Sequence, residues 1–272
     1  MKVAVCLIVR DEARYLPEWM AYHVALGFDT IIIFDNKSAD ATTDIISEAS
    51  NIWDVRVIYW PFTHSWRQID AYLATCREFS NEFDWIAFID ADEFILPLES
   101  SNVKEWLSTI GPDASAIGVH WAMYGSSGHM TPPSGMVIEN YVNRAPDKFG
   151  PNAHVKCLVR PKQVIGVTNP HFFVLNGKYV DPSGGALTFG MPGVTDRFGD
   201  ITKCRINHYF TRSRDDWERR MLRGRFVAGS AKRTWEEFEK YDRNEVFDQS
   251  ISRFAGQTRD HMLTLFSKIP MR

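Results

Sequence analysis

The chain is poor in the features that mark specialised classes of protein. Its 272 residues contain four cysteines, and none of them has the C-x-x-C spacing of a zinc or redox site. Scattered cysteines of this kind predict reduced thiols in a cytoplasmic protein. No apolar stretch approaches the ~20 residues that a membrane-spanning helix needs. We therefore expect no transmembrane segment, while peripheral contact with a membrane stays open.

The chain also lacks an excess of charge and the common phosphate-binding motifs. Its 31 basic and 34 acidic residues give a formal net charge of −3, which argues against broad nucleic-acid binding. No G-x-G-x-x-G follows the first apolar run, which argues against a nicotinamide or flavin site. The sequence has no G-x-x-x-x-G-K-[ST] either, so a P-loop nucleotide site is not expected.

Two alternating patterns fill the first part of the chain. Five short apolar runs, rich in β-branched or aromatic residues, predict strands buried on both faces: 3–9, 30–35, 55–60, 84–90 and 117–122. Helical spacing predicts a helix between Pro17 and Gly27, and two more at about 40–49 and 66–79. This alternation predicts an α/β fold whose mostly parallel sheet is flanked by helices.

The later part of the chain is rich in glycine, proline, serine and asparagine, up to about residue 200. Loops of this kind on a rigid scaffold commonly carry a substrate site. Short strands are expected at 137–142, 155–159, 163–167, 171–175 and 204–210, and helices at 213–229, 233–241 and 256–267. Because no linker or repeat interrupts the chain, we expect one domain over residues 1–272.

The stretch DWIAFIDADEFILP, residues 84–97, runs a predicted buried strand into three acids. Crowded carboxylates repel one another unless a cation or a proton relieves them. If the segment is extended, Asp90 and Asp92 point the same way and can face one cation. Oxygen ligands select a hard ion such as Mg²⁺ or Mn²⁺. The alternative is that Asp92 or Glu93 caps the next turn.

Several segments resemble glycosyltransferase family 92 and related family-2-like transferases, in the right order. The segments are RDEARYLPEWMAYHVALGFDTIIIFDNKSADAT (10–42), DWIAFIDADEF (84–94), MYGSSGHMTPPSG (123–135), HVKCLVRP (154–161) and INHYFTRSRDDWERRMLRG (206–224). The resemblance implies a GT-A-type Rossmann-like fold and a hexosyltransferase that moves a sugar from a nucleotide-sugar donor, UDP-linked, to a glycan or other hydroxyl acceptor with inversion. It divides the domain into a nucleotide-binding half (1–122), a half with the acceptor and the last metal ligand (123–230) and C-terminal helices (231–272).

The resemblance also implies roles for particular residues. Those expected to bind the nucleotide sugar are Arg10, Glu12, Asp35, Asn36, Ser38, Arg67, Gln68, Asp90 and Lys156. Asp90, Asp92 and His208 are expected to hold Mn²⁺ or Mg²⁺, and Arg212, Arg220 and Arg223 are further candidates to assist the leaving diphosphate, as is Lys156.

The general base is not identified by the sequence. His129 is one candidate, and His154, Asp181 and Asp196 are weaker ones. A rival interpretation is a catalytically silent nucleotide- or carbohydrate-binding module on the same fold. A metal-dependent phosphohydrolase is disfavoured, because Phe94 stands where those enzymes usually carry Thr or Val.

Overall fold

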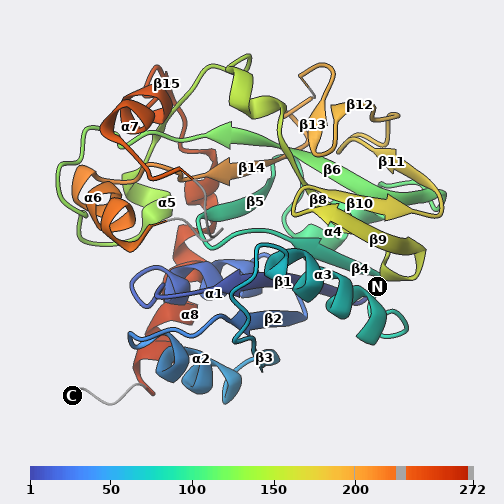
Figure 1. Ribbon diagram of the computed structural model, residues 1–272, viewed down its shortest axis with the longest axis horizontal. Helices are drawn as coiled ribbons and strands as arrows, with labels where there is room; N and C mark the ends of the chain where they lie inside the picture. The colour runs from blue at the N-terminus through green and yellow to red at the C-terminus, as the bar shows by residue number, and fades with distance from the viewer. Residues whose placement is uncertain (199, 225–230, 269–272) are drawn as a thin grey trace.

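The computed structural model describes residues 1–198, 200–224 and 231–268, and it is built around one nine-stranded sheet (Figure 1). The strand order is β3-β2-β1-β4-β8-β6-β14-β5, and β11 pairs with β6 outside this path. The first half contributes β1 (Val3–Val9), α1 (Leu16–Ala25), β2 (Thr30–Asp35), α2 (Thr42–Ser50), β3 (Val55–Tyr59), α3 (Arg67–Glu78) and β4 (Trp85–Phe88). These four strands are parallel to one another, so their carboxyl ends meet at one edge of the sheet.

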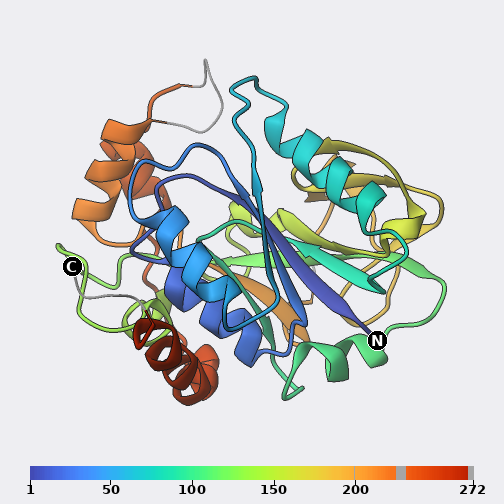
Figure 2. The ribbon, with the colours of Figure 1, turned by 90° about the horizontal axis from the view of Figure 1, so that it is seen from below.

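Strand β1 shows why the apolar runs are continuous. Successive side chains of a strand point to opposite faces, and here both faces are covered. Val3, Val5 and Leu7 belong to the core shared with α1, α2 and α8, whereas Ala4, Cys6 and Ile8 belong to the core shared with α3. Figure 2 shows α3 on the opposite side of the sheet from α1 and α8.

The second half extends the sheet with mixed pairing. Its elements up to β14 are β5 (Glu93–Pro97), α4 (Val103–Ser108), β6 (Ala114–Met123), α5 (Val137–Asn140), β7 (Asn143–Arg144), η1 (Gly150–Ala153), β8 (Val155–Val159), η2 (Pro161–Gln163), β9 (Val164–Asn169), β10 (Phe172–Leu175), β11 (Lys178–Val180), β12 (Phe189–Met191), β13 (Val194–Thr195) and β14 (Cys204–His208). Strand β8 runs antiparallel between β4 and β6, and β14 lies parallel to β6 and antiparallel to β5. Strands β9 and β10 form a separate hairpin.

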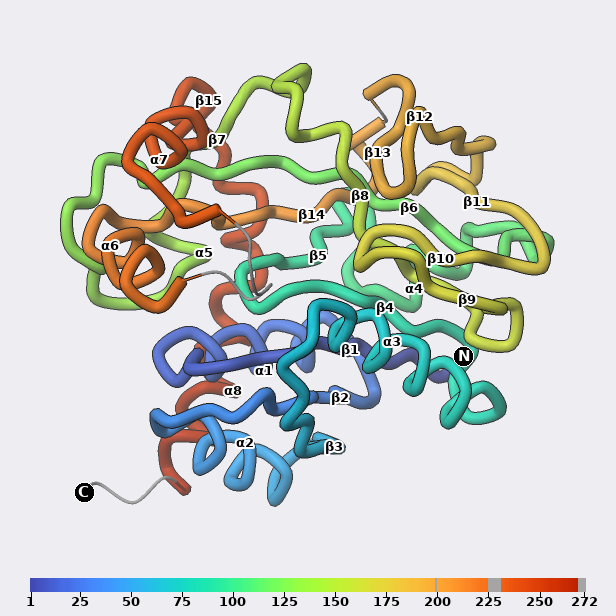
Figure 3. The backbone as a smooth tube through the Cα atoms, in the orientation of Figure 1, coloured from blue at the N-terminus to red at the C-terminus, as the bar shows by residue number. Residues whose placement is uncertain are grey.

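The chain then returns to the first half. Its last elements are α6 (Arg214–Arg223), α7 (Trp235–Tyr241), β15 (Val246–Phe247), η3 (Ser250–Phe254) and α8 (Ala255–Phe266). Figure 3 shows this return, which places α8 beside α1. In the described part of the chain, no helix combines the length and the apolar character that crossing a bilayer requires.

The predicted α/β class, with a mostly parallel sheet flanked by helices, is confirmed. Strands β1, β2 and β8 have the predicted bounds. The predicted helix at 213–229 corresponds to α6, and residues 225–229 lie outside the described part of the chain. Ser213 is the N-cap of α6, as predicted, and accepts a hydrogen bond from the Asp216 amide. Helices α7 and α8 match the predicted C-terminal helices within about two residues, a normal uncertainty for helix ends.

The strand predicted at 137–142 is wrong, because Val137–Asn140 forms the short helix α5. The carboxylate of Glu18 accepts hydrogen bonds from the backbone amides of Val137 and Ile138, at 2.7 and 3.0 Å. An acid that binds the free amides of a first turn stabilises a helix there. Glu18 lies 119 residues from Val137, so the local apolar pattern contained no sign of it.

Candidate active site

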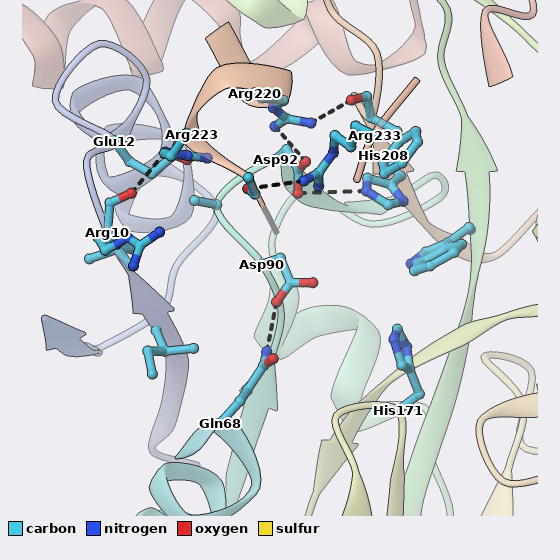
Figure 4. Close-up of a pocket in the computed structure, with 16 residues that line it drawn as sticks. Arg10, Glu12, Gln68, Asp90, Asp92, His171, His208, Arg220, Arg223 and Arg233 are labelled. Atoms are coloured by element: carbon cyan, nitrogen blue, oxygen red, sulfur yellow. Dashed lines mark hydrogen bonds and ion pairs between the residues drawn. The ribbon is translucent and has the colours of Figure 1, made fainter. Parts of the chain in front are cut away.

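A cavity of about 260 Å³ opens at the carboxyl edge of the sheet. Its walls come from the end of β1, the start of α3, the turn after β4, the end of β14 and helix α6 (Figure 4). The polar and aromatic residues that line it are Arg10, Glu12, Gln68, Asp90, Asp92, Trp121, His171, His208, Phe210, Arg220, Arg223 and Arg233. The structure therefore brings together six of the residues that the sequence assigned to the site, from four separate segments: Arg10, Glu12, Gln68, Asp90, Asp92 and His208.

Asp90 lies between two donors. Its Oδ2 accepts a hydrogen bond from the Lys156 ammonium at 2.8 Å, and its Oδ1 accepts one from the Gln68 amide at 3.0 Å. Burial raises the pKa of Asp90, but the charge and the hydrogen bond of Lys156, together with His171, bring the pKa below its usual range. Asp90 is therefore ionised and already neutralised by a side chain.

Asp92 pairs with a different positively charged side chain. Its Oδ2 accepts a hydrogen bond from the Arg220 guanidinium at 2.7 Å, and its Oδ1 lies 3.6 Å from Nε2 of His208. Burial raises the pKa of Asp92, yet Arg220 and then His208 bring it well below the usual range. Asp92 is the carboxylate that joins the turn after β4 to helix α6.

The turn itself corrects one premise of the sequence argument. Residues 90–92 are not extended, because the Glu93 amide donates to the Asp90 carbonyl at 3.1 Å and closes a turn between β4 and β5. Asp90 and Asp92 still line one cavity, but through this turn and not through strand alternation. Glu93 is fully buried and accepts a hydrogen bond from the Asp90 amide at 2.7 Å. Burial raises the pKa of Glu93 to about 7.

Two of the three expected metal ligands fit a divalent ion. Metal–ligand bonds of about 2.1 Å place neighbouring ligand atoms about 3 Å apart, so the 3.6 Å between Asp92 Oδ1 and His208 Nε2 suits one ion. Nδ1 of His208 faces Oε1 of Glu93 at 3.8 Å, and neither atom forms a hydrogen bond with the described part of the chain. A proton on Nδ1 would direct the lone pair of Nε2 toward Asp92. Within residues 1–198, 200–224 and 231–268, no three His, Cys, Asp or Glu side chains gather as a metal site.

Other predicted nucleotide-site residues do not line the cavity but build the loops beside it. Asp35 accepts a hydrogen bond from the Ser38 amide at 3.1 Å, and Ser38 Oγ accepts one from the Asp11 amide at 3.1 Å. The Asn36 amide donates to two carbonyls of the segment after β3, and the guanidinium of Arg67 also donates to two carbonyls there. These contacts fix the loops that follow β1, β2 and β3.

Lys156 and His129 lie away from the cavity lining. Lys156 has no exposed surface and lies beneath Asp90, so its ammonium acts on the acids and not at the cavity wall. His129 directs Nε2 to the Asn140 carbonyl at 3.1 Å and packs against Tyr141. Its role as the base stays a prediction.

Several lining residues were not singled out by the sequence argument, among them His171, Phe210 and Arg233. His171 reaches the cavity from the turn between β9 and β10, and Phe210 follows β14. Arg220 and Arg223 were named only as possible partners of the diphosphate, and the structure gives them acidic partners: Asp92 for Arg220 and Glu12, at 2.9 Å, for Arg223. The amphipathic spacing of α6 was the one signal that could have predicted this, because residues three apart share a helix face.

Comparisons with known proteins identify the class. The model of glycosyltransferase family 92 matches residues 1–253, so the chain belongs to this family. A family 92 protein of Oryza sativa subsp. japonica is 29% identical over 194 residues, covering 68% of this chain and 32% of that protein. One from Ricinus communis is 26% identical over 196 residues, covering 68% and 34%. The chain thus spans about a third of the length of these relatives.

Two solved structures are distantly similar to this chain. The crystal structure of S. aureus TarS 1-349 in complex with UDP-GlcNAc has a TM-score of 0.40 and 16% identity, covering 59% of this chain and 46% of that one. Glucosyl-3-phosphoglycerate synthase from Mycobacterium tuberculosis, in complex with Mn²⁺, UDP-glucose and phosphoglyceric acid, has a TM-score of 0.35 and 13% identity, covering 60% and 58%.

Proposed function

We propose that the chain transfers a sugar from a nucleotide-sugar donor, UDP-linked, to a hydroxyl group of a carbohydrate acceptor, with inversion at the sugar. The observation that carries this proposal is the convergence of the β1 end, the turn after β4 and the β14 end on one cavity. Membership of glycosyltransferase family 92 supports the same reaction.

The nucleotide part of the donor belongs on the β1 side of the cavity. Arg10, Glu12 and Gln68 line that side, and Asp35, Asn36, Ser38 and Arg67 shape the loops around it. Carboxyl ends of parallel strands are the usual place for a nucleotide in an α/β sheet. The diphosphate would then face Asp92, Arg220 and Arg223.

Asp92 and His208 would hold a divalent ion, Mn²⁺ or Mg²⁺, with Asp90 beside them. Such an ion, when bound, stabilises negative charge on the leaving diphosphate. The protein's own contribution is to keep Asp92 ionised, to orient His208 through Glu93, and to present two arginines to the diphosphate. The four cysteines are buried free thiols, which supports a reducing, cytoplasmic setting, with contact at a membrane surface as an open alternative.

Thermal unfolding with a panel of nucleotide sugars, each with and without Mn²⁺, tests the proposal. A ligand that binds only the folded state at 100 times its Kd stabilises that state by about 2.7 kcal/mol. We expect one UDP-sugar to raise the melting temperature in Mn²⁺ and Asp92→Asn to remove the Mn²⁺-dependent part of the rise. Asp113→Asn is the matched control, because Asp113 is exposed and pairs with the exposed Lys178.

Two results would contradict the proposal in different ways. If no nucleotide sugar raises the melting temperature of the wild type in Mn²⁺, the donor assignment is wrong. If a UDP-sugar binds but neither the sugar nor UDP is released with any acceptor, including water, the chain is a silent binding module.

A further inference from the structure

We propose that His171 is the general base that takes the proton from the acceptor hydroxyl. This inference rests on the proposed sugar transfer. His171 lies at the turn between β9 and β10 and lines the same cavity as Asp90 and Asp92. Figure 4 shows its ring pointing into the cavity from the far side of Asp90, opposite Gln68 and Arg10. The base therefore approaches from the side away from the residues that would hold the nucleotide.

The tautomer of His171 is fixed by the backbone. Nδ1 lies 2.9 Å from the carbonyl oxygen of Val155, and a carbonyl only accepts, so Nδ1 carries the hydrogen. The lone pair is therefore on Nε2, and no described residue forms a hydrogen bond with that atom. Burial and then the charge of Lys156 lower the pKa of His171 to about 3, so the ring is neutral at pH 7.

The other proton acceptors that line the cavity are engaged with cations. Glu12 pairs with Arg223, Asp90 with Lys156 and Asp92 with Arg220. His208 faces Asp92 and Glu93 and would be a metal ligand. Among the described lining residues, His171 is the imidazole that is left with an available lone pair. A base must reach the proton that it removes, and the cavity position meets that requirement.

Three charged or titratable groups act on His171: Lys156, Asp90 and His154. Lys156 disfavours the protonated ring, and Asp90 favours it. The diphosphate gains one negative charge as its bond to the sugar breaks. That charge opposes the effect of Lys156, so the proton affinity of Nε2 rises as the sugar is transferred.

The proposed step balances in atoms and electrons. The acceptor oxygen forms a bond to the anomeric carbon of the donor sugar, and its proton moves to Nε2 of His171. The bond from that carbon to the phosphate oxygen breaks, and its electron pair leaves with the nucleoside diphosphate. The proton on Nε2 then passes to water, which restores the neutral ring.

Release of UDP from a UDP-sugar, with water or added methanol as the acceptor, tests the role without knowledge of the natural acceptor. His171→Asn keeps an amide that can donate to the Val155 carbonyl but has no group at the place of Nε2. His171→Gln offers an oxygen near that place, which accepts a hydrogen bond but does not take a proton. We expect kcat to fall by about 10²- to 10⁴-fold in both variants, with UDP affinity unchanged in a binding titration.

Free imidazole gives a readout that a structural role would not move. In His171→Ala, added imidazole is expected to restore part of the UDP release, because it supplies the missing base. His129→Asn tests the rival base, and we expect it to keep wild-type kcat. Loss of activity in His129→Asn together with wild-type kcat in both His171→Asn and His171→Gln would overturn the inference.

Failure of the base assignment is distinguishable from failure of the function. If the His171 variants keep wild-type kcat and still bind the UDP-sugar, the role of His171 as the base is wrong. The transferase proposal is not affected by that result. If the wild type binds no UDP-sugar, both the base assignment and the transferase proposal are wrong. Binding by the wild type without UDP release with any acceptor, including water and methanol, also overturns the role, because a silent module needs no base.

Discussion

Lys156→Met is a sharp test of how the acids of the cavity are stabilised. The Lys156 side chain has no exposed surface, and its ammonium lies 2.8 Å from Asp90 and 3.6 Å from Glu93. Burial lowers the pKa of Lys156, but Asp90 and Glu93 raise it above the ordinary value, so the amine stays protonated. Methionine has a similar length and no charge. The substitution therefore removes the cation and preserves most of the packing.

The distances allow the magnitude to be worked out. At an effective dielectric constant of about 20, unit charges 2.8 Å apart attract by about 6 kcal/mol. The desolvation of the ammonium offsets part of that attraction in the wild type. Removal of one partner from a buried pair leaves the other charge uncompensated, and such changes cost about 3–5 kcal/mol. We expect Lys156→Met to lower the free energy of unfolding by an amount in this range.

Urea denaturation at neutral pH measures the loss. The double variant Lys156→Met/Asp90→Asn should recover part of it, because the stranded carboxylate is then absent. Lys178→Met is the matched control, since Lys178 is exposed and pairs with the exposed Asp113, and it should change the unfolding midpoint little. A Lys156→Met protein as stable as the wild type would refute the assignment of Lys156 as the counter-ion of Asp90.

Three further predictions concern single side chains. Glu93→Gln should weaken Mn²⁺ binding in a calorimetric titration by about 10- to 100-fold, because the carboxylate that faces Nδ1 of His208 is lost. Arg220→Gln should tighten Mn²⁺ binding by the nucleotide-free protein and weaken UDP binding, because Asp92 loses its resident cation. Burial raises the pKa of Glu18 from 4.5 to about 7, so its stabilising contribution is complete below pH 4.5 and is lost as the pH rises through 7. Glu18→Gln should remove this loss, about 3 kcal/mol, from denaturation curves recorded across that range.

The fold of the first half could be predicted because its signals are local. A strand that is buried on both faces must be apolar at nearly every position, and β1 is apolar throughout and β2 from Ile31 to Phe34. The parallel order of β1 to β4 then follows from strand–helix alternation. The error at 137–142 has the opposite cause. A short apolar run has no preferred state of its own, and the carboxylate of Glu18 on α1 decides that it is a helix.

The site residues divide in the same way, into those that local signals could place and those that depend on pairing between distant segments. The residues after β1 and β4 could be placed together, because carboxyl ends of parallel strands share an edge. The burial of Lys156 could not be predicted, because it depends on β8 pairing antiparallel beside β4. His171 was missed for a similar reason. It reaches the cavity only through the hairpin of β9 and β10, and the sequence argument treated it as the first residue of the strand expected at 171–175.

The negative charge of each of the three acids after β4 is compensated in a different way. Lys156 neutralises Asp90 from beneath, Arg220 neutralises Asp92 from α6, and Glu93, with its pKa raised to about 7, can carry a proton. A metal ion that binds Asp92 must therefore compete with a guanidinium that is already in place. A diphosphate changes this balance, because it offers Arg220 a new anionic partner close to the old one. If the proposed ion and donor bind here, we therefore expect them to bind jointly, since each removes an obstacle to the other.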